Sequence, residues 1–98
     1  TGCYAEARAL ATFAHTHPQA QVVGVDIQDT PQAAKAFYQR FGWRHPSISD
    51  LAGRIAAQLR LQGLPTTLFL DRRHRVVAKI VGETNLAGFD AGYQKARA

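Results

Sequence analysis

The chain has 98 residues, of which 46% are hydrophobic and 19% are charged, a composition typical of one small globular domain with a single core. No apolar run approaches the ~20 residues needed to cross a bilayer, and the start lacks the pattern of a signal peptide, so we expect any membrane anchor to lie outside the chain. A single cysteine excludes an internal disulfide framework and a multi-cysteine zinc site.

The net charge of +5 would suit an anionic partner, but most basic residues are scattered along the sequence. The only dense basic run is residues 72–75 (RRHR), and it contains no aromatic residue for base stacking. We interpret this run as a solvated hairpin tip and expect no nucleic-acid partner. The chain starts at Thr1 and contains no methionine, so we expect it to be part of a longer protein.

The first part of the chain predicts a helix followed by a strand. Residues 4–15 are rich in alanine, carry Leu10 and Phe13 on one face, and end shortly before Pro18, which is the pattern of an amphipathic helix. Residues 21–27 (QVVGVDI) are mostly apolar and partly β-branched, which favours an interior strand buried on both faces.

A second helix is predicted to begin at Pro31, because proline suits the first position of a helix and the preceding Asp29 and Thr30 are capping residues. Apolar residues recur at helical spacing up to Gly42, where this helix should end. Residues 42–49 are expected to form a loop.

A third helix and a hairpin complete the middle of the chain. Asp50 is expected to cap the third helix, whose apolar stripe comprises Leu51, Ile55 and Leu59. The runs 66–70 (TTLFL) and 76–81 (VVAKIV) are β-rich and flank a polar turn, which predicts an antiparallel hairpin.

The end of the chain predicts a last helix, and the element order predicts a missing strand. His74 suits a left-handed turn position, and Asn85 is expected to cap a helix that buries Phe89 and Tyr93. Because a βαβ unit needs a strand before its helix, we expect one just before Thr1.

Two motifs carry the chemical signal of this sequence. Residues 1–6 (TGCYAE) open the first helix, and residues 63–71 (GLPTTLFLD) lead into the hairpin. Together with the element order, these motifs resemble the thioredoxin superfamily, and more narrowly its TlpA/ResA-type (DsbE-like) thiol:disulfide oxidoreductases. The resemblance covers essentially the whole chain.

The resemblance implies that the sequence begins inside a Cys-x-x-Cys motif. Thr1 and Gly2 would be the two residues between the cysteines, and Cys3 would be the buried, resolving cysteine. The attacking cysteine would lie immediately upstream. A thiolate is the nucleophile of disulfide exchange and a helix N-terminus favours it, which explains why such motifs begin helices.

The resemblance also assigns four other positions. Glu6 falls on the acidic position three residues after the second cysteine, where it would accept a proton from the resolving thiol. Pro65 falls on the cis-proline that faces the dithiol, and the backbone of Leu64 would pair with an extended substrate. Asp29 sits where some relatives carry an acid near the active site, but we favour a capping role for it beside Pro31.

The resemblance implies an α/β fold for residues 1–98, a thioredoxin-like three-layer sandwich with a mixed sheet, helices on both faces and its N-terminal strand missing. The expected activity is reduction or exchange of disulfides in extracytoplasmic proteins, including apocytochromes during cytochrome c maturation. Its partners would be protein disulfide substrates and a membrane-linked thiol:disulfide electron donor. No metal or organic cofactor is implied, and contact with the membrane would be only through an anchor outside the chain.

Two alternative functions stay open. One is a one-cysteine peroxidase of the peroxiredoxin type, and the other is a redox-inactive binding module that has lost its first cysteine. Taken alone, Cys3 is an ordinary buried residue, Glu6 is a favourable first-turn acid, and Trp43 is expected to pack in the core or a loop. The four histidines have no metal-like spacing and are expected at the surface: His15, His17, His45 and His74.

Overall fold

The computed structural model describes residues 2–27 and 30–98. Its contacts divide the chain into two compact units. The first unit comprises the residues up to His17 together with Gln62–Ala98, and the second comprises Pro18–Leu61.

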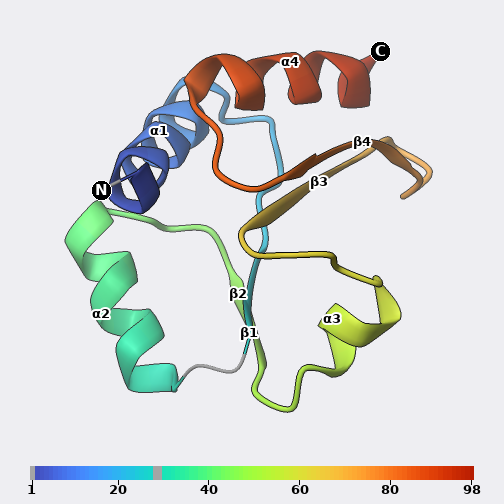
Figure 1. Ribbon diagram of the computed structural model, residues 1–98. Helices are drawn as coiled ribbons and strands as arrows, with labels where there is room; N and C mark the ends of the chain where they lie inside the picture. The colour runs from blue at the N-terminus through green and yellow to red at the C-terminus, as the bar shows by residue number, and fades with distance from the viewer. Residues whose placement is uncertain (1, 28–29) are drawn as a thin grey trace. The chain divides into compact units, whose positions relative to one another are not determined.

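The first unit consists of two helices and a hairpin (Figure 1). Helix α1 spans Gly2–Thr16, strands β3 (Thr66–Leu70) and β4 (Val76–Val81) form the hairpin, and helix α4 spans Leu86–Arg97. The strands pair antiparallel, which confirms the predicted hairpin, and residue 74 at its turn has a φ of 61° in the left-handed region, as expected for a histidine there.

The core of the first unit is where α1 and α4 meet over the hairpin. Phe13 and Phe89 are 4% and 2% exposed, and their ring centroids lie 6.0 Å apart. Tyr93 meets Phe13 edge to face at 5.5 Å, an arrangement favoured by the ring quadrupoles. The ring of Phe69 on β3 lies against Gly92 on α4, where any side chain larger than that of glycine would overlap the ring. The predicted buried face of the last helix is thus confirmed.

The second unit contains two parallel strands and two helices. Strand β1 (Gly24–Ile27) pairs with β2 (Ser47–Asp50), with helix α2 (Pro31–Phe41) between them in the chain and α3 (Arg54–Gln58) after them. Figure 1 shows β1 and β2 side by side.

The ends of α2 confirm the capping prediction. The Thr30 hydroxyl accepts a hydrogen bond from the Ala33 N–H at 3.2 Å, and Pro31 occupies the first helical position. Gly42 ends the helix with a φ of 68°, and its N–H donates to the Tyr38 carbonyl. Asp29, the other expected cap, lies outside the described residues.

The prediction of a loop over residues 42–49 is wrong at its end, because β2 begins at Ser47. Nothing in the local sequence SISD marks a strand. The extended conformation is stabilised by pairing with β1, from Gly24 opposite Ser47 to Ile27 opposite Asp50. Such a partner is distant in sequence, so local propensity does not show it.

The third helix is shorter than predicted and starts later, at Arg54 with Gly53 at the N-cap position, so Asp50 is not its N-cap residue, although the Asp50 carboxylate binds N–H groups of its first turn. One carboxylate oxygen of Asp50 accepts from the Ile55 N–H at 3.1 Å and the other from the Ala56 N–H at 3.0 Å. Burial alone would raise the pKa of Asp50, but the backbone N–H donors outweigh it and lower the pKa. The expected apolar stripe is not buried, because Leu51 and Leu59 are 64% and 46% exposed.

Strand β1 is not buried on both faces, contrary to expectation, since Val25 is 38% exposed. Within the described residues β1 pairs only with β2, and β3 pairs only with β4, so the strands form two two-stranded sheets in place of one mixed sheet. A strand is enclosed only when neighbours cover both its edges and its faces. The strand expected before Thr1 stays a prediction.

Two histidines expected at the surface are partly buried among aromatic rings. His17 stacks on Phe13 with ring centroids 4.5 Å apart, and its Nε2 lies 3.7 Å from the Asp90 carboxylate. His45 lies 5.0 Å from the Trp43 ring, and burial lowers its pKa. Trp43 itself packs in this cluster, as predicted.

We expect Gly92→Ala to destabilise the protein by about 1–3 kcal/mol, because the added methyl would overlap the Phe69 ring. At an exposed helix position the same change would be stabilising, by roughly 1 kcal/mol. Urea unfolding measures the difference. The control is Ala91→Ser on the exposed side of α4, which should change stability by less than about 0.5 kcal/mol. A neutral or stabilising Gly92→Ala would contradict this account of the core.

Candidate functional site

The cysteine of the first motif lies where it was expected along the backbone. Cys3 falls in the first turn of α1, since the helix begins at Gly2. The position of its sulfur lies outside the described residues, as does Thr1, so the expected contact between the sulfur and Pro65 stays a prediction. Glu6 follows three residues later, and residues at this spacing share one side of a helix.

Glu6 is a buried acid. Its side chain is only 9% exposed, and its carboxylate accepts a hydrogen bond from the Thr84 backbone N–H. Burial raises the pKa of Glu6, and the nearby negative charge of Glu83 raises it further, while the Thr84 hydrogen bond opposes both. A carboxyl with a raised pKa holds its proton to higher pH than an exposed glutamate does, which suits it to accepting a proton from a neighbouring group.

The second motif forms the start of β3. The Leu64–Pro65 bond is cis, which confirms the prediction from the resemblance. The Pro65 carbonyl accepts a hydrogen bond from the Gly82 N–H at 2.8 Å. The hydroxyl of Thr66 donates to the Gly63 carbonyl across the same turn, and Leu64 is 62% exposed. The turn is thus held by its own hydrogen bonds while Leu64 faces solvent.

Residues 82–84 connect the two motifs. Gly82 binds the Pro65 carbonyl, and Thr84, two residues later, binds the Glu6 carboxylate. The first turns of α1 and the cis-proline turn therefore both contact one three-residue segment. The structure thus connects Glu6 and Pro65 within the first unit.

Sequence reasoning missed the contribution of Glu83 and Thr84. They follow the hairpin as an ordinary polar loop, Gly-Glu-Thr, and nothing in that loop indicates that it faces the first helix. The one indication of its role is its position along the chain. The loop directly follows β4, and β4 pairs with β3, which begins just after the cis-proline.

Two other properties bear on the site. Among the side chains that the structure describes, no three His, Cys, Asp or Glu residues come together to hold a metal ion. Within the same residues, no helix combines the length and the apolar character of a membrane span.

Comparison with known proteins finds thiol-disulfide oxidoreductases and disulfide oxidoreductase homologues similar to this chain, in sequence and in fold. The chain is 27% identical over 75 residues to the thiol-disulfide oxidoreductase ResA of Bacillus cereus, covering 76% of the chain and 43% of ResA. It is 29% identical over 63 residues to ResA of Bacillus anthracis, covering 64% of the chain and 36% of that protein. The chain therefore spans less than half the length of these relatives. No protein-family model matches it.

Solved structures extend the likeness to nearly the whole chain. A secreted Mycobacterium tuberculosis disulfide oxidoreductase homologous to E. coli DsbE superposes with a TM-score of 0.83 at 18% identity, over 93% of this chain and 69% of its own. MTB DsbF gives 0.86 at 21% identity, over 98% and 72%. StoA from Bacillus subtilis gives 0.76 at 17% identity, over 92% and 71%.

The chain has a thioredoxin-like fold, and its sequence is similar to ResA thiol-disulfide oxidoreductases. This confirms the α/β thioredoxin-like fold expected from the sequence. In this thioredoxin-like chain, the positions that the motifs single out are Cys3 and Glu6 on α1 and the cis-proline turn at Pro65.

We expect Glu6→Gln to make stability less dependent on pH. The folded-state pKa of Glu6 is raised above its ordinary value of 4.5, so the folded state holds the proton more tightly than the unfolded state. Wild-type protein therefore loses stability as pH rises from 4.5 through the raised pKa, a loss that glutamine cannot show. We therefore expect the variant to gain stability relative to the wild type as pH rises through this range. Urea unfolding at a series of pH values measures the difference between their free energies of unfolding.

Glu83→Gln is the matched control for this pH effect. Removing the Glu83 charge should lower the pKa of Glu6 and so narrow the pH range over which stability is lost. The increase in the pKa of Glu6 that burial causes should remain. A difference between Glu6→Gln and wild type that stays constant with pH, or decreases as pH rises, would show that Glu6 does not have a raised pKa.

Proposed function

We propose that this chain carries the resolving half of the active site of a thiol:disulfide oxidoreductase that acts on other proteins. The observation that carries the proposal is the connection of α1 to the cis-proline turn through residues 82–84, which brings an acid on the cysteine-bearing helix to the turn that the family uses for substrate. The likeness to ResA over 76% of the chain supports it.

The proposed reaction is a two-step thiol–disulfide exchange. The thiolate of a cysteine immediately before Thr1 attacks a substrate disulfide, forming a mixed disulfide and releasing one substrate thiolate. Cys3 then loses its proton to Glu6 and attacks the enzyme sulfur of the mixed disulfide. An internal disulfide forms and the second substrate sulfur leaves as a thiolate, which can take up the proton held by Glu6, so the substrate has gained two electrons from the enzyme dithiol.

The turn before β3 would position the substrate in this reaction. The exposed Leu64 would offer its backbone to an extended segment of the substrate, as in strand addition, while Thr1 and Gly2 would border the same groove. A membrane-linked thiol:disulfide donor would then reduce the internal disulfide and restore the dithiol.

We further propose that the protein acts outside the cytoplasm, anchored by sequence beyond this chain, on substrates that include apocytochromes in cytochrome c maturation. One structural relative is described as secreted, which supports the location. Disulfide chemistry is also concentrated in oxidising compartments.

Cys3→Ser in the full-length protein should trap the mixed disulfide with substrate, because the residue that resolves it is gone. Turnover with a disulfide-bonded protein substrate should fall by at least about a hundredfold. Non-reducing electrophoresis with mass spectrometry detects the trapped adduct, and a coupled thiol assay measures turnover.

Thr12→Ala, on the exposed side of the same helix, is the control and should leave both readouts unchanged. If Cys3→Ser retains full turnover and forms no adduct, the proposal is wrong. Reduction of peroxide without reduction of protein disulfides would favour the peroxidase alternative, and absence of any redox activity in the wild type would favour the binding module.

A second test concerns the strand expected before Thr1. We expect a version extended upstream through that strand and the attacking cysteine to be more stable than the 98-residue chain, because the strand would supply hydrogen-bond partners to backbone groups at the edges of the present strands. Cooperative denaturant unfolding compares the two. Equal stability and equal disulfide reductase activity would contradict both the expected strand and the two-cysteine chemistry.

A further inference from the structure

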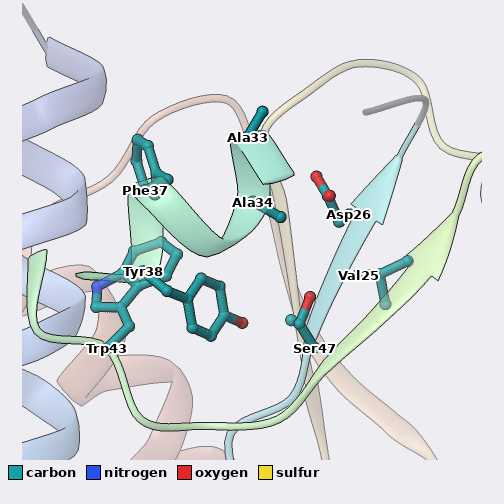
Figure 2. A pocket seen from close by; sticks show the side chains of 9 residues that line it. Val25, Asp26, Ala33, Ala34, Phe37, Tyr38, Trp43 and Ser47 are labelled. Atoms are coloured by element: carbon teal, nitrogen blue, oxygen red, sulfur yellow. The ribbon is translucent and has the colours of Figure 1, made fainter. Parts of the chain in front are cut away.

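The second unit contains a pocket of about 400 Å³ between α2 and the strands β1 and β2 (Figure 2). This volume falls within the range of small-molecule sites in proteins. The pocket plays no part in the proposed redox chemistry, whose described residues all belong to the first unit.

One side of the pocket is polar. Figure 2 shows the hydroxyl group of Tyr38 directed toward Ser47 on β2, and the carboxylate of Asp26 on β1 directed toward the N-terminal part of α2. Burial raises the pKa of Tyr38, Ser47 hydrogen-bonds to its side chain, and the charge of Asp26 raises the pKa further, so the three groups interact. Tyr38 can reach this position because Gly24 beneath its hydroxyl has no side chain.

The other side of the pocket is aromatic and is held in place by ring contacts. Trp43 meets Phe37 edge to face with centroids 5.1 Å apart and an interplanar angle of 68°. It meets Tyr38 in the same way at 5.2 Å and 82°. These contacts fix the rings that line the cavity, and Ala34 on α2 leaves the space between them open.

The charge of the lining is opposite to that of the chain as a whole. Asp26 is the only charged side chain among the described residues that line the pocket, whereas the chain carries a net charge of +5. A carboxylate beside aromatic faces attracts a cation, through direct charge pairing and through the ring quadrupoles. Three oxygen acceptors also match the three N–H donors of a primary ammonium group.

We propose that this pocket binds a small primary ammonium ion with an apolar body. The ammonium group would donate to Asp26, Tyr38 and Ser47, and the body would lie against Phe37 and Trp43. The site is independent of the dithiol chemistry, so either proposal stands if the other fails.

The test uses 2-phenylethylammonium as the probe and 2-phenylethanol as its neutral counterpart, titrated into the full-length protein. The indole Nε1–H of Trp43, the only tryptophan of this chain, reports on the pocket in ¹H–¹⁵N spectra and is assigned with Trp43→Phe. We expect the ammonium ion to shift this signal with a Kd below about 1 mM, and the alcohol to bind at least about tenfold more weakly.

Asp26→Asn should weaken binding of the ammonium ion by about tenfold or more and leave binding of the alcohol unchanged, since it removes the charge at nearly constant size. Glu83→Gln removes one charge from the first unit and should change neither affinity. Tyr38→Phe should weaken only the ammonium ion, by a smaller factor. Two results with the wild type alone would overturn the proposal. One is equal affinity for the two probes, and the other is absence of any shift of the Trp43 signal at probe concentrations up to 10 mM.

Discussion

The packing of α1 on α4 is the contact on which the candidate site depends. Phe13, near the end of α1, is 4% exposed and contacts both Phe89 and Tyr93 on α4. Because α4 in turn lies on the hairpin through Gly92 and Phe69, the orientation of α1 is set relative to β3 and β4. The N-terminal end of α1 therefore meets the loop that follows β4. Without this core, Cys3 and Glu6 would have no fixed relation to the cis-proline turn.

The electrostatics of the site follow from that packing. Glu6 is buried because the helix is pressed against residues 82–84, and the same contact brings the charge of Glu83 close. Both effects disfavour the ionised carboxylate, while the Thr84 N–H partly offsets them. A surface glutamate one turn further along the helix would not have this proton affinity.

The two units contain the two proposed sites separately. The first unit holds the residues assigned to disulfide exchange, and the second holds a pocket whose only lining charge, among the described residues, is a carboxylate. The second unit is organised around aromatic contacts of α2 and the residues after it, in which Trp43 and His45 take part. Its strands pair parallel, so the α2 segment between them acts as the crossover that brings β2 beside β1.

Local chemistry in the sequence determined much of this protein. Thr30, Pro31 and Gly42 delimit α2 through a side-chain cap, a preset φ and a left-handed end, and each acts within a few residues of itself. The hairpin and the last helix are equally local, and the motifs around Cys3 and Pro65 indicate the thioredoxin-like fold. Tertiary structure alone decided the rest. Strand β2 exists because β1 supplies its hydrogen bonds, and Glu83 raises the pKa of Glu6 because α1 packs beside the loop after β4. These features depend on groups far apart in sequence, and their contact energies arise only once the chain has folded.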